Sequence, residues 1–235
     1  CYMTFKTIIA VAAATALALF PAAAKDMTYK VVSPDGHLSA TVTVGQSVSY
    51  SVSRDGVNLI DASQISMTLA DGIVFGENDK VRKVKKTSVD QTLSTVAYKK
   101  AQVRDNYNEI TLIFKEFSLA FRAYDEGVAY RFTSSLKNDS KVLAEKAQFN
   151  FAKDWDAYVP YVNQHIETLE SQYWNSFENT YSIHALSRWN KKRLAFLPVA
   201  VSAEGGMKVL VTESDLVNYP GMYLYNEGDA TTLTG

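Results

Sequence analysis

Short runs that alternate between apolar and polar residues, separated by turn residues, constrain the fold of this chain most. The clearest runs are LSATVTV (38–44), SVSYSVSRDG (47–56) and QISMTLADG (64–72). Successive side chains of a strand point to opposite faces, so this alternation buries one face and exposes the other. Gly supplies the positive φ that tight hairpin turns require, and Asp-Gly pairs occur at 35–36, 55–56 and 71–72.

The same pattern continues through most of the chain. Further runs are EITLIFK (109–115), FSLAFRAYDEG (117–127), VAYRFTSSL (128–136), AQFNF (147–151), RLAFLPVAVSA (193–203) and MKVLVTES (207–214). Turns recur at intervals of about 8–12 residues, and no capped helical pattern is longer than about two turns. We therefore predict an all-β fold, a large antiparallel β-sandwich from about Met27 to Tyr225.

Most motifs of stand-alone enzymes are missing from the sequence. There is no Gly-rich phosphate loop, no GxSxG and no histidine pair at the spacing that binds zinc on a helix. We interpret His37, His165 and His184 as surface or hydrogen-bonded histidines, and Glu167 and Glu170 as solvated acids. The aspartates before glycine would also suit a metal, but turn chemistry alone explains them.

The first residues have the character of a secretory signal peptide. Lys6 precedes an apolar run from Ile8 to Phe20, which small residues follow up to Ala24. A membrane-spanning helix needs about 20 apolar residues, so this run is too short to cross a bilayer. We predict that residues 1–24 are a signal peptide cut after Ala24, and that the protein is periplasmic or secreted.

The net charge and the cysteine content limit which partners and which cellular compartment we expect. The formal net charge is −1, which gives no electrostatic reason to expect nucleic acid or an anionic membrane as a partner. The one cysteine, Cys1, precedes the predicted cleavage site. A secreted chain without cysteine suits a bacterial periplasm better than a disulfide scaffold.

Residues 154–190 differ from the rest because they are rich in aromatic residues and lack clean periodicity. All three tryptophans, at 155, 174 and 189, fall there. Disordered segments are poor in aromatics, so we predict an ordered, mostly irregular region that forms a ligand or interface surface. It includes SFENTYS (176–182), where Glu178 is either a solvated loop acid or an acid held for chemistry.

Several motifs resemble the N-terminal domain of glycoside hydrolase family 97. VTESDLVNYPGMYL (211–224) is the longest and most specific match, and VVSPDGHLSATVTV (31–44) resembles the first hairpin of that domain. DEGVAYRF (125–132) resembles its central strand, and SFENTYS resembles the segment before its later strands. The matches occur in order over nearly the whole mature chain.

The resemblance implies a super-sandwich of the galactose-mutarotase-like kind, spanning residues 25–235, that packs on a (β/α)₈ barrel. Family members are secreted or periplasmic calcium-dependent α-glucosidases and α-galactosidases. Their calcium ion is held mainly by barrel glutamates and by one glutamate of the N-terminal domain, which the resemblance places at Glu178. The catalytic residues lie in the barrel, so none is assigned here, and the chain alone is expected to be inactive.

Two classes of function remain open at this point. The first is an N-terminal domain that packs on its own catalytic barrel, forms part of the active-site pocket and contacts an oligosaccharide substrate. The alternative is a freestanding secreted carbohydrate-binding β-sandwich. The chain is expected to continue past Gly235 in the first case, and the DNA downstream would decide between the two.

Overall fold

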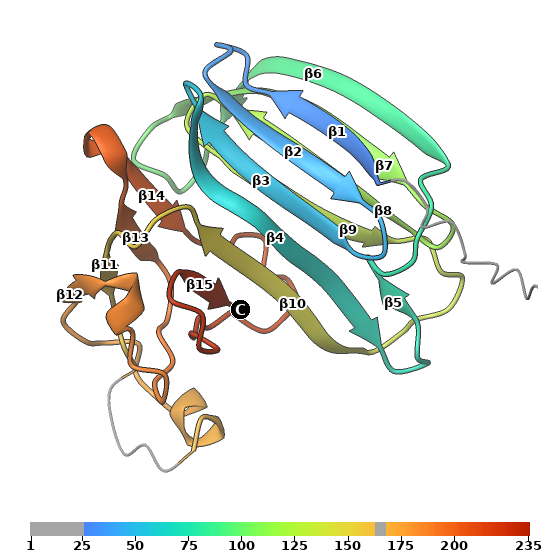
Figure 1. The fold of residues 1–235 in the computed structure, drawn as a ribbon. Coiled ribbons are helices and arrows are strands. Elements are labelled where there is room, and N and C mark those ends of the chain that lie inside the picture. Colours follow the sequence, from blue (N-terminus) through green and yellow to red (C-terminus); the bar gives the residue numbers. More distant parts are fainter. Residues whose placement is uncertain (1–25, 163–167) are drawn as a thin grey trace, which may run out of the picture.

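The computed structural model describes residues 26–162 and 168–235, in which strands form three antiparallel sheets (Figure 1). The predicted signal peptide, His165 and Glu167 lie outside the described residues. The first sheet, here called the long sheet, has the order β1-β2-β3-β4-β10-β15, with β5 paired to β4. Its strands are β1 (Met27–Val32), β2 (Leu38–Val44), β3 (Val48–Arg54), β4 (Val57–Leu69), β5 (Val74–Phe75), β10 (Val142–Phe151) and β15 (Thr232–Thr234).

The second sheet, here called the meander sheet, joins four consecutive strands in chain order. These are β6 (Lys83–Ser94), β7 (Gln102–Ile113), β8 (Phe117–Tyr124) and β9 (Val128–Ser134). It lies behind β1, β2 and β3 of the long sheet and forms the second layer of a sandwich (Figure 1).

The third sheet, here called the short-strand sheet, has the order β12-β11-β13-β14. Its strands are β11 (Asp156–Val159), β12 (Ser182–Ala185), β13 (Val199–Ser202) and β14 (Lys208–Val211). Three 3₁₀ helices lie in its connections, η1 (Glu170–Tyr173), η2 (Leu186–Arg188) and η3 (Glu204–Gly206). Within the described ranges, no helix is long and apolar enough to cross a membrane.

One apolar core joins the three sheets. On β8, the alternate residues Phe117, Leu119 and Phe121 are at most 2% exposed, as the sequence pattern predicts. The rings of Phe117 and Phe75 stack with their centroids 4.5 Å apart, which ties the meander sheet to the long sheet. Val159 and Val201 of the short-strand sheet belong to the same buried cluster.

The predicted all-β sandwich is confirmed, and the predicted hairpin turns are present. β2 spans the same residues as its sequence run, and Asp55 and Gly56 form a two-residue turn with φ of 50° and 80°. Gly36 and Gly72 also have positive φ, of 82° and 83°.

The structure differs from the sequence prediction at the ends and in the irregular region. The described residues 154–162 and 168–190 contain β11 and β12, two strands of the short-strand sheet, although much of the rest of these two ranges has no regular structure. The strand predicted at 193–203 is shorter, because Pro198 has no amide to donate and β13 begins after it. No sequence run was quoted for β5 or β6, and β15 lies beyond the predicted end of the sandwich at Tyr225.

Gly76, directly after β5, is the glycine at which a side chain would be most strained. Its φ is +95°, and an added Cβ would lie 2.7 Å from the backbone oxygen of Ile65. We expect Gly76→Ala to lower the free energy of unfolding by about 1–3 kcal/mol, measured by denaturant titration. Gly127→Ala is the control, since a Cβ there would meet nothing within 4 Å. Equal unfolding midpoints for the two variants would contradict the packing described here.

Candidate functional site

The segment that carries Glu178, here called the site loop (residues 172–181), runs from η1 into β12. Its first residue, Gln172, is 1% exposed. The Gln172 Nε2 donates to the Lys192 carbonyl at 2.9 Å, and its Oε1 accepts the Leu194 amide at 2.8 Å. A buried amide is tolerated when both of its ends are hydrogen-bonded. Gln172 therefore fastens the site loop to the segment that leads towards β13.

Two asparagines fix the middle of the site loop. Asn175 Nδ2 donates to the Gln172 carbonyl at 2.9 Å and to the Tyr223 hydroxyl at 3.1 Å, while its Oδ1 accepts the Phe177 amide at 2.8 Å. Asn179 Nδ2 donates to the Tyr161 carbonyl, which follows β11, at 2.7 Å. The residues on both sides of Glu178 thus have backbone or side-chain contacts that hold the chain in place.

Glu178 itself is exposed, and its side chain makes no hydrogen bond or ion pair within the described part of the chain. The preceding residue, Phe177, has a φ of 55°, an uncommon conformation for a residue with a side chain. The described residues contain no group of three His, Cys, Asp or Glu that could hold a metal ion. Glu178 therefore presents one carboxylate from a fixed backbone and can supply one ligand of a metal site, but not a complete one.

Aromatic rings surround the site loop. The ring centroid of Tyr223 lies 5.2 Å from that of Tyr173 and 5.9 Å from that of Phe177, whose ring also contacts Phe196. Tyr173 and Phe177 are 56% and 58% exposed, whereas Phe196 is 8% exposed. We call Tyr173, Phe177 and Tyr223 the aromatic surface; its inner side packs on a second, smaller buried cluster of Val162, Leu194 and Phe196.

The three tryptophans of the irregular region do not share one environment. Trp189 is 3% exposed and contacts the rings of Tyr161 and His184. Trp155 is partly buried against the main core. Trp174, inside the site loop, is 92% exposed. Exposed aromatic side chains therefore lie in the middle of the region, whereas the tryptophans at its two ends pack inside; the ligand or interface role of the region stays a prediction.

The two histidines that the structure describes are surface or hydrogen-bonded residues, as the sequence predicts. His184 Nε2 lies 3.0 Å from the Tyr161 hydroxyl, and its Nδ1 lies 2.9 Å from the Ala185 carbonyl oxygen. His37 is exposed and pairs with Asp55 at 2.5 Å, and this partner raises the pKa of His37. Neither histidine belongs to a cluster of metal ligands in the described ranges.

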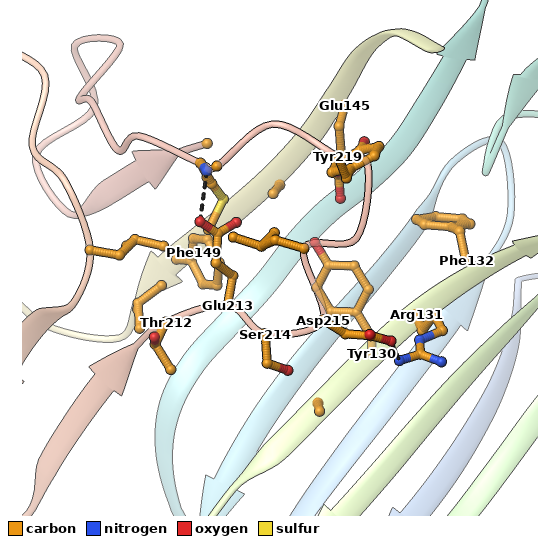
Figure 2. Close-up of a pocket in the computed structure, with 18 of the residues that line it drawn as sticks. Tyr130, Arg131, Phe132, Glu145, Phe149, Thr212, Glu213, Ser214, Asp215 and Tyr219 are labelled. Carbon is orange, nitrogen blue, oxygen red and sulfur yellow. Dashed lines mark hydrogen bonds and ion pairs between the residues drawn. The ribbon is translucent and has the colours of Figure 1, made fainter. Parts of the chain in front are cut away.

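A large cleft of about 2420 Å³ opens beside the site loop, between β9, β10 and residues 212–222, here called the crossing segment (Figure 2). Asp215 pairs with Arg131 on β9, and the Tyr219 hydroxyl donates to Glu145 on β10 at 2.8 Å. Burial and this hydrogen bond raise the pKa of Tyr219. The crossing segment therefore connects the edge of the meander sheet with the long sheet.

The crossing segment leads to Tyr223, so two motifs that lie apart in the sequence meet in space. VTESDLVNYPGMYL (211–224) contains both the crossing segment and Tyr223, and SFENTYS contains Phe177 and Glu178. The stacked rings of Phe177 and Tyr223 join the two motifs at the end of the cleft.

Comparison with known proteins now identifies the fold family. The family profile described as Glycosyl-hydrolase 97 N-terminal matches residues 31–234. The chain belongs to this family. The resemblance seen in the sequence motifs is thus confirmed over nearly all the described residues.

Relatives of this family 97 N-terminal domain are longer proteins. The retaining alpha-galactosidase of Bacteroides thetaiotaomicron is 42% identical over 208 residues, which are 88% of this chain and 31% of that protein. The glycoside hydrolase family 97 enzyme of Pseudoalteromonas sp. strain K8, solved with acarbose and as a variant with panose, superimposes with a TM-score of 0.72 at 22% identity. That superposition covers 87% of this chain and 31% of the enzyme. A beta-arabinopyranosidase superimposes with a TM-score of 0.76 at 21% identity, over 88% of this chain and 35% of that one.

Sequence reasoning singled out Glu178 but missed the residues that position it. In the sequence, nothing distinguishes Gln172, Asn175 and Asn179 from ordinary polar loop residues. No local pattern shows that a loop glutamine is buried. Tyr223 lies within the motif that carries the family resemblance, but its contact with the site loop joins residues 46 positions apart. Only the tertiary fold reveals these contacts.

We expect Gln172→Ala to loosen the site loop of the family 97 domain. The change leaves the buried Leu194 amide and Lys192 carbonyl without partners, which costs about 1–3 kcal/mol of unfolding free energy. Limited proteolysis should then cut within residues 168–181 faster than in the native chain, because local opening becomes easier. Gln91→Ala is the matched control, since Gln91 makes one exposed hydrogen bond, to Asp105. Identical cutting rates for both variants would show that Gln172 does not hold the loop.

Proposed function

We propose that this domain forms one wall of the active site of a secreted, calcium-dependent α-glycosidase, with Glu178 as its single calcium ligand. The observation that carries the proposal is the exposed Glu178 carboxylate, which has no hydrogen-bond or ion-pair partner among residues 26–162 and 168–235, on a loop whose neighbouring residues are held by hydrogen bonds. An exposed acid on a fixed backbone suits a metal site that another domain completes.

The chemistry of calcium supports a shared site. Calcium takes about 6–8 oxygen ligands and favours carboxylates. Glu178 supplies at most two of these oxygens, so the remaining ligands would come from the catalytic domain. When bound, the ion would supply positive charge near the place where negative charge develops during glycoside cleavage.

The outer face of the short-strand sheet suits the docking of a catalytic domain. Ile183, Tyr158, Ala200 and Leu210 are successive cross-strand partners on β12, β11, β13 and β14 and form one apolar row. Ile183 and Leu210 are 62% and 59% exposed, whereas alternate residues of β11, β13 and β14, such as Val159, Val201 and Val211, are buried. Ile183 lies five positions after Glu178, so a domain that covers this row would meet the site loop at the row's end.

The substrate, partner and location of the whole protein are proposed from its relatives and its sequence. The named relative is a retaining alpha-galactosidase, and a structural neighbour binds acarbose. We therefore propose an oligosaccharide as substrate, either an α-glucoside or an α-galactoside, and the chain's own catalytic barrel as partner. The signal peptide predicted over residues 1–24 supports a periplasmic or secreted location, and this domain alone is proposed to hydrolyse no glycoside.

A freestanding carbohydrate-binding module is the second candidate. The exposed rings of Tyr173 and Phe177 favour it, because aromatic faces bind sugars with or without a catalytic domain. A reading frame that continues past Gly235 into alternating strand and helix patterns would support the first candidate over this one.

The calcium role is tested in a chimera in which this domain replaces the matching part of the Bacteroides thetaiotaomicron retaining alpha-galactosidase. We expect Glu178→Gln to weaken calcium binding by more than about tenfold. Mutating even a residue that only hydrogen-bonds to a metal ligand typically lowers metal affinity by about 10–100-fold. Activity at limiting calcium should fall with it, because glutamine keeps the shape but removes the charge that calcium favours.

Calorimetric titration with calcium and an aryl α-galactoside assay give the two measurements. Glu77→Gln is the matched control, since Glu77 is an exposed glutamate in the turn after β5. In the isolated domain Glu178→Gln should change little, because one carboxylate does not hold calcium. Normal calcium affinity and turnover in the Glu178→Gln chimera would show that Glu178 is an ordinary surface acid.

A further inference from the structure

The site loop exposes more aromatic area than its own packing requires. Trp174, Phe177 and Tyr173 are 92%, 58% and 56% exposed, and they lie within five consecutive residues. Exposed aromatic side chains are unfavourable in water, so burying them against a ligand is favourable. A cluster of this kind on the surface of a soluble protein indicates a binding site.

The exposure of these rings is not the result of a loose loop. Gln172 immediately precedes Tyr173 and is held by two backbone partners, while Asn175 immediately follows Trp174 and holds the Tyr223 hydroxyl. The Tyr223 ring then contacts both Tyr173 and Phe177. The aromatic surface is therefore fixed before any ligand arrives, which lowers the entropic cost of binding.

Polar groups lie among the rings. The Tyr223 hydroxyl and the Asn175 amide meet at 3.1 Å beside the stacked rings of Phe177 and Tyr223. The exposed Glu178 carboxylate follows Phe177 directly. A sugar ring has apolar C–H faces and a rim of hydroxyls, so it matches aromatic faces flanked by amide, hydroxyl and carboxylate groups.

The apolar row on the short-strand sheet is mainly aliphatic, unlike the aromatic surface. It consists of Ile183, Ala200 and Leu210 with one tyrosine, which suits contact with a protein domain. The apolar row is thus the candidate surface for a protein domain, and the aromatic surface is the candidate for a sugar. The aromatic surface has more polar groups beside it.

We propose that the exposed Trp174, which directly follows Tyr173 of the aromatic surface in the site loop, binds a hexose ring of an oligosaccharide by stacking. The assignment rests on the proposed function only in taking an oligosaccharide as ligand. Binding by stacking requires neither calcium nor a catalytic domain, so it is measurable on this chain alone.

Tryptophan fluorescence gives a direct readout, because Trp174 is the exposed member of the three. Trp189 is 3% exposed and Trp155 is partly buried, so a change of emission on adding a sugar reports on Trp174. The chain is titrated in EDTA with panose as an α-glucoside and with raffinose as an α-galactoside. We expect a saturable change of emission with at least one of them.

Variants then separate stacking from a structural effect. Trp174→Ala should abolish the emission change and weaken sugar binding, followed by calorimetry, by about tenfold. Trp174→Tyr should restore most of the affinity, since it keeps an aromatic face. Tyr98→Ala, which removes a 58% exposed tyrosine between β6 and β7, should leave affinity unchanged.

Two results would overturn the proposal. One is the absence of saturable binding of both sugars to the folded native chain. The other is unchanged affinity in Trp174→Ala. Either result leaves the calcium role of Glu178 standing, because that role is measured in the chimera by calcium titration. Conversely, sugar binding in EDTA would persist even if Glu178 proved to bind no calcium.

Discussion

The inner face of the long sheet extends further than the meander sheet that packs on it. The long sheet continues through β10 and β15 after β4, whereas the meander sheet ends at β9. Apolar side chains beyond β4, such as Phe151 and Leu233, must still be buried, and the short-strand sheet buries them within the same core cluster. The cleft lies between these two covering sheets, and the crossing segment spans it (Figure 2).

The meander sheet and the short-strand sheet together cover the long sheet, and the position of the candidate site follows from this arrangement. The site loop leads into β12 of the short-strand sheet, and its residues Tyr173 and Phe177 line the cleft. Backbone groups in a connection of this length need partners, and the amides of Gln172, Asn175 and Asn179 supply several of them. Rigid scaffolds commonly present functional residues in this way, on loops whose backbone is held by a few side chains.

The sequence predicted the parts of the fold that depend on local pattern. β2, β3 and β8 combine strict alternation with nearby turn glycines, so both their existence and their buried faces were predictable. β6, KVKKTSVDQTLS, was missed because it is an edge strand with mostly exposed residues, and charged edge strands lack an apolar pattern. Trp189 and Trp174 look alike in sequence, yet one is buried and the other exposed, because tertiary contacts decide their environment. Glu178 was found through the family resemblance and not through any local pattern.

The central claim is that the site loop is an ordered part of the sandwich that holds Glu178 and Trp174 in place. Hydrogen exchange of the Leu194 amide tests it most directly, because this amide donates to the buried Gln172 side chain and not to a strand partner. The structure predicts that Leu194 exchanges about as slowly as the amides of β11 and β13, since its bond breaks only when the loop detaches. Exchange at the rate of a solvated loop amide would show that the loop is not held, and it would contradict the claim.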